Sequence, residues 1–349
     1  VVAVFAVLAA FVALSQSAPA SSQLRPSASV LPASSAKQAP ELVGVSDFDN
    51  TDPLTLAGKR GSVVLVDFWT YTCINCRRTF PFLRALQKTY GGKDFTVLGV
   101  HSPEFAFERD HGNVARAVRE LGVTWPVAED PDMATWDAFR NQYWPADYLV
   151  DRSGRIRYVH YGEGGDADIE KAVRALLDEG GTAPAASVGQ VEASERPGNG
   201  LTPETYFGGE RSGNYLAGGE IVPPGRTVTR DDPDPGPDQV RVHGRVTGKT
   251  ESLLLGKDAW VEQQLTARDV YLTASSQVGP VTLDVTLDGQ PVPADRRGRS
   301  LQVVGGRTVV VVEKDDLYAL LTAGAVEKGT LRLTAQADGA ELFTTTYGG

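Results

Sequence analysis

An apolar run from Val63 to Phe68, interrupted only by Asp67, leads within five residues into a pair of cysteines, Cys73 and Cys76. A run of this kind is typical of a strand that is covered on both faces of a sheet. From Arg77 to Tyr90, apolar side chains recur at helical spacing until two glycines end the pattern. The cysteines therefore stand where a buried strand ends and a helix begins, which restricts this part of the chain to an α/β fold.

The alternation of strands and helices continues beyond this motif. A turn at residues 151–154 separates two short apolar runs and predicts a hairpin. Strands that alternate with helices in this order predict an α/β sheet with helices on both faces. The elements that we expect are strands over 95–100, 148–150 and 156–161, and helices over 108–121 and 169–177.

The spacing of the cysteines points to thiol chemistry. With two residues between them, one turn of helix brings the sulfur atoms into bonding range. The unpaired N–H groups and the positive dipole end at the start of a helix stabilise a thiolate, so we expect a depressed pKa at Cys73. Cys73 is then the attacking sulfur, and Cys76, one turn deeper, resolves the mixed disulfide.

Two other uses of a cysteine pair are disfavoured by the rest of the sequence. A cysteine-based zinc site needs further ligands, but the chain has two cysteines and four scattered histidines. An inert disulfide over a two-residue loop would restrict the unfolded chain very little. We therefore predict a redox-active pair with no metal and no cofactor.

Composition limits the number of domains and the class of partner. A chain of 349 residues suggests about two domains. With 34 basic and 44 acidic residues, the formal net charge is −10, and the sequence contains no block of Lys or Arg. Nucleic acid is therefore not expected as a partner, because phosphate binding needs a concentrated basic surface.

The first 40 residues differ from the rest of the chain. Val1 to Leu14 is an uncharged apolar run, and the residues from Ser15 to Pro40 are rich in Ser, Ala and Pro. The run suits a signal-peptide core or the end of a transmembrane helix, although no Lys or Arg precedes it and the chain does not begin with Met. A buried helix of a soluble domain is the third interpretation. The first two place the remaining residues outside the cytoplasm, on a flexible tether.

The C-terminal half has a different character. Residues 181–200 are rich in Ala, Pro, Ser and Gly and are predicted to be a linker, at which the two halves should be separable. Residues 201–349 contain short runs of Val, Leu and Thr between Gly and Asp turns, which predict a β-sandwich. The expected strands cover 239–246, 259–265, 269–274, 281–287, 300–304, 308–312 and 330–335.

Exposed aromatic side chains in this half could form a sugar-binding platform. The candidates are Trp260, Tyr206 and Tyr215. We favour the alternative that Trp260 and Tyr271 are core aromatics on inward strand faces, because aromatic side chains dominate cores. No cluster of nucleophiles appears here, so no catalysis is expected in this half.

The strand and the cysteine motif together resemble the thioredoxin superfamily. More narrowly, residues 41–180 resemble the thioredoxin-like domain of DipZ-type cytochrome c biogenesis proteins, which are related to the TlpA and redoxin group. Thr202 to Tyr206 resembles the segment that follows this domain in DipZ-type proteins, where a galactose-binding-like or carbohydrate-binding sandwich comes next. The segments that carry the resemblance are 67–76, 100–105, 143–151 and 160–164.

This resemblance implies a membrane-linked thiol–disulfide oxidoreductase that faces the extracytoplasmic side. Its substrates would be protein thiols and disulfides, and its electron donor would lie in the membrane. Thr72 and the pair Ile74-Asn75 depart from thioredoxin itself, which leaves the direction of electron transfer unassigned.

Three further site residues follow from the match. Pro145 stands where the superfamily keeps a cis-proline facing the sulfurs, although it could be an ordinary trans proline that opens a strand. Asp67 corresponds to the buried acid that takes the proton of Cys76, although it could lie in solvent at a strand end. Glu163 is a candidate second acid, with a solvated loop carboxylate as the alternative.

The histidines and a nearby acid receive weaker assignments. His101 and Glu104 follow the second central strand, where doubly wound folds gather functional groups. Either could act on the thiolate, but a hydrogen-bonded role in the loop is the better interpretation. His111 and His160 are expected to be surface or packing residues.

Two functions remain open at this stage. The first is an enzyme that exchanges disulfides through Cys73 and Cys76, in cytochrome c maturation or in redox homeostasis of the cell envelope. The alternative is a module that binds cell-envelope glycan or a protein through the C-terminal sandwich, with a thioredoxin-like domain that is only structural. The intact cysteine pair, together with Asp67 and Pro145, favours the first.

The motif predicts that Cys73 is the more reactive thiol, because Cys76 lies deeper along the helix. Alkylation of the reduced protein at mildly acidic pH should label Cys73 first, as read by peptide mass spectrometry. Preferential labelling of Cys76 would reverse the two roles.

Overall fold

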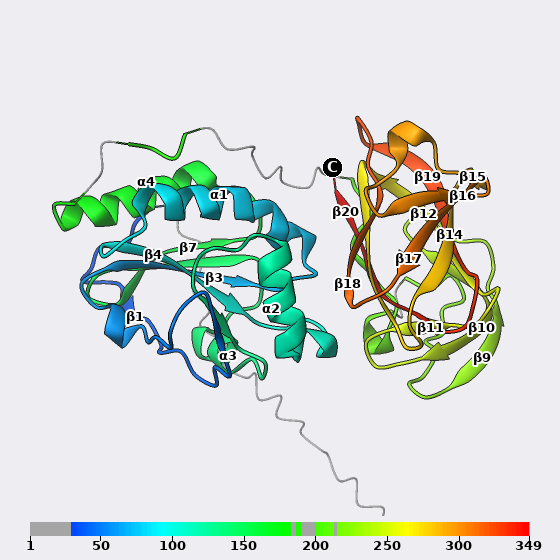
Figure 1. Ribbon diagram of the computed structural model, residues 1–349, viewed down its shortest axis with the longest axis horizontal. Coiled ribbons are helices and arrows are strands. Elements are labelled where there is room, and N and C mark those ends of the chain that lie inside the picture. Colours follow the sequence, from blue (N-terminus) through cyan, green and yellow to red (C-terminus); the bar gives the residue numbers. More distant parts are fainter. Residues whose placement is uncertain (1–28, 183–185, 190–199, 213–214, 349) are drawn as a thin grey trace, which may run out of the picture.

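The computed structural model describes residues 29–182, 186–189, 200–212 and 215–348. The chain forms two parts that lie side by side, an α/β part (residues 29–182) and a β part (residues 200–348), on the left and right of Figure 1. The apolar run from Val1 to Leu14 lies outside the described residues, as does most of the predicted linker. None of the helices in the described ranges combines the length and the apolar character needed to cross a bilayer.

The α/β part is a seven-stranded mixed sheet in the order β1-β7-β6-β3-β4-β5-β2. The central strands β3, β4 and β5 are parallel to one another, and every other pair is antiparallel. The strands are β1 (Lys37–Gln38), β2 (Phe48–Asp49), β3 (Val63–Trp69), β4 (Phe95–His101), β5 (Val127–Glu129), β6 (Ala146–Val150) and β7 (Arg155–Tyr161). The α-helices are α1 (Ile74–Tyr90), α2 (His111–Glu120), α3 (Ala134–Phe139) and α4 (Asp166–Glu179), with 3₁₀ turns η1 (Ala57–Lys59) and η2 (Ala106–Arg109).

Helices cover both faces of this sheet, as the sequence predicts. Leu65 on β3 belongs to the core that α1, α2 and α4 form, whereas Phe68 on β3 packs against Trp136 and Phe139 of α3. Strand β3 is buried along its whole length, and so is β4. The continuous apolar runs of the two strands follow from this double coverage.

Several boundaries differ from the expectation. Helix α1 begins three residues earlier than predicted, because Cys73 is its N-cap. The expected helix over 108–121 is divided into η2 and α2. Strand β1 pairs with β7, so the predicted tether up to residue 40 already includes the edge of the sheet. The short elements α3, β2 and β5 were not predicted, because they have few residues in which a period can appear.

The β part contains one antiparallel sheet of 13 strands that surrounds an apolar core. Its path runs β16-β17-β14-β19-β12-β10-β11-β20-β13-β18, with β15, β8 and β9 attached at the sides. The strands are β8 (Thr205–Tyr206), β9 (Thr227–Asp231), β10 (Val240–Gly248), β11 (Leu253–Leu255), β12 (Trp260–Ala267), β13 (Asp269–Ser276), β14 (Val281–Leu287), β15 (Gln290–Pro291), β16 (Leu301–Val304), β17 (Arg307–Val312), β18 (Asp316–Leu321), β19 (Glu327–Ala335) and β20 (Ala340–Gly348), with 3₁₀ turns η3 (Gly209–Arg211) and η4 (Ala294–Arg296).

The all-β prediction for this half is therefore confirmed, although β20 was not expected from the sequence. This strand carries three consecutive threonines, Thr344 to Thr346, and lacks a clear apolar alternation. The threonines are nevertheless buried, and their hydroxyls bond to neighbours such as Glu204 and the backbone of Thr205. Hydrophobic periodicity cannot predict a strand whose buried side chains are polar and hydrogen-bonded within the fold.

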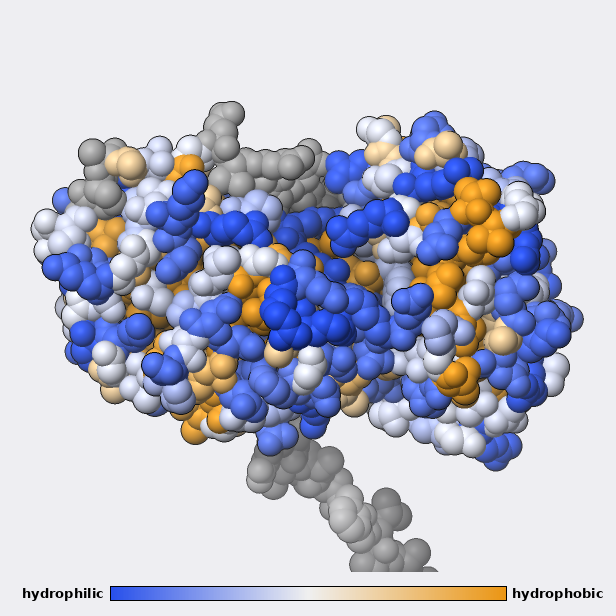
Figure 2. Space-filling model, in the orientation of Figure 1, coloured by the Kyte–Doolittle hydropathy of each residue, from blue (hydrophilic) through white to orange (hydrophobic). Residues whose placement is uncertain are grey.

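The two parts meet along an interface that the sequence does not predict. Phe343 on β20 lies with its ring centroid 5.1 Å from that of Phe105 and 4.9 Å from that of Phe107. Lys314 pairs with Glu120 on α2 at 2.6 Å. Hydrophilic side chains dominate the visible surface along this junction (Figure 2). The division at 181–200 stays a prediction, but the parts share a packed boundary.

Removal of the Phe343 ring tests this boundary. A buried Phe→Ala change costs about 3–5 kcal/mol, so we expect Phe343→Ala to lower the midpoint of thermal unfolding and to expose the junction to proteases. Val278→Ala is the control, because Val278 is 70% exposed. Equal unfolding midpoints for the two variants in calorimetry would show that the junction contributes little.

Candidate active site

The cysteine pair lies at the start of α1, directly after the loop that follows β3. The backbone N–H of Cys76 donates to the Sγ of Cys73 at 3.2 Å, so the Cys73 sulfur caps the helix. Cys73 is partly exposed, whereas Cys76 is fully buried, and both thiols are free. This geometry matches the predicted order, with an accessible first sulfur and a shielded second sulfur.

The acidity of Cys73 differs from the expectation. Burial raises the pKa of the Cys73 thiol, and the carboxylates of Glu104 and Glu204 raise it further, while the thiol and N–H of Cys76 lower it. The predicted depressed pKa is thus wrong, because burial of the thiol outweighs the lowering effect of the hydrogen bonds with Cys76. Burial lifts the pKa of Cys76 still further above its usual value, so Cys73 keeps the higher expected reactivity.

Asp67 lies beneath the cysteines on β3 and faces a second acid. It is 1% exposed and directly opposite Asp147, which is 3% exposed, in the antiparallel β3–β6 register. Both oxygens of Asp67 are buried without a hydrogen-bond partner. Burial, together with the charge of Asp147, raises the pKa of Asp67 well above its usual value, and burial raises the pKa of Asp147 to about 7.

Asp67 is thus a buried acid and not a strand-end residue in solvent. Its charge contributes to the raised pKa of Cys76, which places the carboxyl within electrostatic reach of that thiol. Sequence reasoning missed Asp147, although an aspartate in an otherwise apolar strand was an available signal.

Pro145 follows a cis peptide bond from Trp144, as the sequence predicts. The carbonyl of Pro145 accepts from the N–H of Gly162 at 2.9 Å, and the indole of Trp144 donates to the carbonyl of Ser102 at 3.0 Å. These bonds fix the loop that leads into β6. The role of Pro145 toward a substrate stays a prediction.

Glu163 is buried and not solvated. The side chain of Arg78, on the second turn of α1, lies 3.3 Å from its Oε1, while Oε2 has no hydrogen-bond partner. Burial raises the pKa of Glu163 to about 6, although Arg78 opposes the shift. The same guanidinium lies 5.4 Å from the ring centroid of Tyr271, on β13 of the β part.

A buried glutamate that sequence reasoning missed holds the loop before Cys73. Glu108, on η2, accepts from the backbone N–H of Thr72 at 3.1 Å and from its hydroxyl at 2.6 Å. Its other oxygen accepts from the N–H groups of Glu104 and Phe105 at 2.8 and 3.0 Å. One carboxyl therefore joins the loop between β3 and α1 (residues 70–73, the cysteine loop) to the loop after β4.

His101 has the hydrogen-bonded loop role that we favoured. It is buried, its ring stacks on Tyr71 at 5.7 Å, and its Nε2 accepts from the N–H of Tyr71 at 3.3 Å. Burial lowers the pKa of His101 to about 3, so the ring is neutral at physiological pH.

The β part contributes directly to the surroundings of the motif. Arg77, immediately after Cys76, donates to the carbonyl of Tyr71 and pairs with Asp316 at 2.6 Å. The hydroxyl of Tyr71 donates to the carbonyl of Asp315 at 3.3 Å. The turn between β17 and β18 therefore contacts the cysteine loop.

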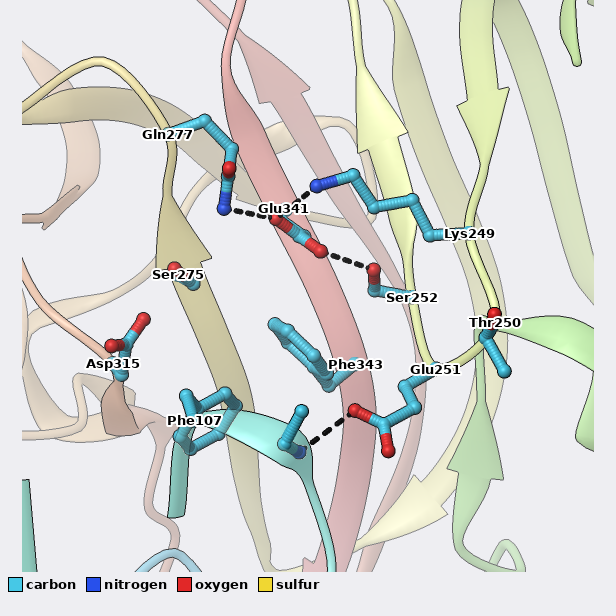
Figure 3. A pocket seen from close by; sticks show the side chains of 11 residues that line it. Phe107, Lys249, Thr250, Glu251, Ser252, Ser275, Gln277, Asp315, Glu341 and Phe343 are labelled. Atoms are coloured by element: carbon cyan, nitrogen blue, oxygen red, sulfur yellow. Dashed lines mark hydrogen bonds and ion pairs between the residues drawn. The ribbon is translucent and has the colours of Figure 1, made fainter. Parts of the chain in front are cut away.

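A cavity of about 500 Å³ opens along the junction, with Phe107 and Phe343 on one side (Figure 3). The buried carboxylate of Glu341 accepts there from Lys249, Ser252 and Gln277. Across the cavity, Glu251 accepts from the N–H of Ala106 on η2 at 2.8 Å. Both parts of the chain thus line this cavity.

One group of side chains could hold a metal ion. Asp47, His111 and Glu129 offer ligand atoms that all lie within 4.8 Å of one another, at the sheet edge formed by β2 and β5. His111 is exposed, as predicted, and its Nδ1 lies 2.7 Å from Oε1 of Glu129. None of the three belongs to the cysteine site.

Two aromatic residues that we expected in the core of the β part, Trp260 and Tyr271, lie outside it. Trp260 and Tyr271 are partly exposed, so their assignment as inward-facing core residues is wrong. On β12 the alternation places Val261 inward and Trp260 outward. The Trp260 ring stacks on His243 at 4.9 Å and has the guanidinium of Arg332 4.2 Å from its centroid.

Comparisons with known proteins divide the chain in the same way. Residues 33–176 match the family described as Redoxin, and residues 202–348 match the thioredoxin-like C-terminal domain family. The chain is 37% identical over 281 residues to Protein DipZ of Mycobacterium tuberculosis, which covers 77% of this chain and 39% of DipZ. The chain thus spans about two fifths of the length of the DipZ proteins that it matches.

Two smaller proteins each match 40% of this chain. Thiol-disulfide oxidoreductase YkuV of Bacillus subtilis is 31% identical over 142 residues, which is 40% of this chain and 94% of YkuV. A crystal structure of a thiol-disulfide isomerase from Corynebacterium glutamicum is 26% identical, with a TM-score of 0.37, and covers 40% of this chain and 96% of the isomerase.

The buried carboxyl of Asp147 makes stability depend on pH. Its pKa is higher in the folded chain than in the unfolded chain, so the fold loses stability as pH rises through about 7. We expect Asp147→Asn to raise the free energy of unfolding at pH 8 by about 1 kcal/mol or more, and to change it less at pH 5. Denaturant titrations at both pH values measure this difference.

The matched surface change is Asp52→Asn, since Asp52 is exposed. It should leave the stability unchanged at both pH values. If Asp147→Asn destabilised the chain equally at pH 5 and pH 8, the carboxyl would have a packing role and no electrostatic cost.

Proposed function

The chain belongs to the family of thioredoxin-like thiol–disulfide oxidoreductases, and we propose that it exchanges disulfides with proteins through Cys73 and Cys76. The observation that carries this proposal is the contact at the start of α1. There the N–H of Cys76 donates to the Cys73 sulfur, which is partly exposed while Cys76 is buried. A nucleophile and its resolving thiol need this arrangement.

In the proposed reaction, the Cys73 thiolate attacks one sulfur of a substrate disulfide. The substrate S–S bond breaks, a mixed disulfide forms, and the first substrate sulfur leaves and takes up a proton. Cys76 then loses its proton and attacks the Cys73 sulfur. This step releases the second substrate thiol and leaves a Cys73–Cys76 disulfide, so two electrons have passed to the substrate. The reverse sequence oxidises a substrate dithiol.

Asp67 is the proposed acceptor of the Cys76 proton. A carboxyl with a raised pKa is suited to this task, since it can hold a proton near neutral pH. Asp147 lies opposite Asp67, and repulsion between two neighbouring carboxylates disfavours ionisation of both at the same time. Glu163 is the second proposed acid, and Pro145 is proposed to present its backbone to the substrate.

The cellular setting is also part of the proposal. Similarity to DipZ over both parts of the chain supports an extracytoplasmic location, membrane-anchored or secreted, with electrons supplied by a membrane partner. The substrates would be protein thiols in cytochrome c maturation or in redox homeostasis of the cell envelope.

The alternative of a glycan-binding module has less support. A sugar platform needs an open aromatic face, but His243 and Arg332 lie against the Trp260 ring. The ring of Tyr206 lies under the guanidinium of Arg211, 3.4 Å from its centroid. These neighbours occupy space over both rings that a stacked sugar would need.

The reduction of insulin disulfides by the full chain, with dithiothreitol as the electron source, tests the function. The unaltered protein should accelerate reduction, and Cys73→Ser should lose the acceleration. Cys76→Ser should also lose turnover but should accumulate a mixed disulfide between Cys73 and the substrate, visible by mass spectrometry. If Cys73→Ser retained full activity, the proposal would be wrong.

Asp67→Asn is expected to slow the resolving step, because it removes the proton acceptor for Cys76 while leaving the cap at Cys73 in place. At neutral pH the mixed disulfide should persist about 10²-fold longer in quenched-flow experiments. Asp52→Asn serves as the control. An unchanged rate of resolution would make Asp67 a bystander.

A further inference from the structure

Two glutamates from different parts of the chain meet at a single hydroxyl near the cysteine loop. The Oη of Tyr206, on β8, lies 2.9 Å from Oε1 of Glu104 and 2.8 Å from Oε2 of Glu204. Glu104 belongs to the loop after β4 in the α/β part, whereas Glu204 and Tyr206 belong to the β part. The contact therefore crosses the junction.

The Tyr206 hydroxyl has one hydrogen, but two carboxyls lie within hydrogen-bond distance of it. A phenol carries one hydrogen and can donate to one carboxyl only. Burial and the two carboxylates hold the pKa of Tyr206 well above its usual value, so the phenol stays protonated. Two ionised carboxyls would therefore compete for this one hydrogen, whereas a protonated Glu104 would bring a hydrogen of its own. The geometry thus favours a proton on Glu104 in this pair.

The surroundings of the pair support a shared proton near neutral pH. Burial raises the pKa of Glu104 to about 7, with a contribution from the charge of Glu204. Three other charged groups face the pair: Glu108 on η2, Arg211 on η3, and Glu251 across an adjoining cavity of about 540 Å³. Arg211 opposes the shift, since its guanidinium donates to Oε1 of Glu104 at 2.9 Å.

The pair is connected to the reactive cysteine. The N–H of Glu104 donates to Glu108, and Glu108 accepts from both the N–H and the hydroxyl of Thr72, the residue before Cys73. The charges of Glu104 and Glu204 both act on the Cys73 thiol. On the far side, Glu204 accepts from the hydroxyl of Thr346 on β20 at 2.7 Å.

We propose that Glu104 and Glu204, joined through the Tyr206 hydroxyl, form a proton-sharing pair that tunes the reactivity of Cys73, so the β part completes the thiol site. This inference rests on the proposed function, which assigns the attack to Cys73. Tyr206 and Arg211 are positioning residues in this account, since they act through the two carboxyls. When the pair loses its shared proton, its second negative charge disfavours the Cys73 thiolate.

The rate of Cys73 alkylation by iodoacetamide, measured from pH 5 to pH 10 on the reduced full chain, tests the inference. The logarithm of the rate should rise with a slope of one per pH unit except near pH 7, where ionisation of the pair should flatten it. Glu104→Gln and Glu204→Gln should each remove the flattened section. Each should also move the midpoint of the profile down by about half a pH unit, because one negative charge is gone.

Tyr206→Phe is a second, conservative test that keeps the ring under Arg211. Without the hydroxyl, the carboxyls lose their shared donor, and the flattened section should move to higher pH. Glu120→Gln is the matched control: it removes an acidic partner of Lys314 at the junction but does not contact the pair, so its profile should equal that of the unaltered protein.

Two results would overturn the inference. One is a profile for Glu204→Gln that equals the profile of the unaltered protein. The other is a shift in Glu120→Gln as large as those in the pair variants, which would indicate general loosening of the junction. Alkylation needs no disulfide substrate, so a chain that fails to reduce insulin but shows the predicted profiles would contradict the proposed function alone.

Discussion

The burial of ionisable groups around the start of α1 is the constraint on which the rest of the structure depends. Asp67, Asp147, Glu108 and Glu163 are each 5% exposed or less. Glu108 bonds to Thr72 and Glu163 pairs with Arg78, and these two partners flank the free cysteine pair. Asp67, Asp147 and Glu163 each have a buried oxygen without a hydrogen-bond partner, which is unfavourable for stability. Perturbed acids that cluster in this way are characteristic of a reactive site.

These four carboxyls are held in place in three different ways. Asp67 and Asp147 are placed by strand register, Glu108 by the N–H groups of its own turn, and Glu163 by Arg78 of α1. The Cys73 sulfur is held by the first turn of α1. Because these contacts belong to the sheet, the loops and the helix, the site has the rigid support that preorganised chemistry requires. The β part also contacts the surroundings of the cysteine pair, because Asp316 pairs with Arg77 and the Tyr206 hydroxyl bonds to Glu104.

Much of the site could be predicted from local sequence. The apolar run into Cys73 and the helical spacing after Cys76 follow from patterns within a few residues, and the cis bond before Pro145 follows from the resemblance to the thioredoxin superfamily. What could not be predicted depends on residues far apart in the chain. The raised pKa of Cys73 follows from burial at the junction, and a helix N-terminus alone suggests the opposite direction. Asp147 matters because register places it opposite Asp67, and the outward position of Trp260 depends on which face of β12 covers the core.

The reduction potential of the cysteine pair shows whether Cys73 and Cys76 form a reversible, redox-active disulfide. The full chain would be equilibrated in glutathione or dithiothreitol buffers of defined ratio, quenched with acid, alkylated and analysed by mass spectrometry. We expect a reversible Cys73–Cys76 disulfide with one midpoint between about −270 and −120 mV, the range of catalytic thiol–disulfide pairs. Thiols that stay free in every buffer, or a disulfide that is reduced only below about −300 mV as structural disulfides are, would contradict it.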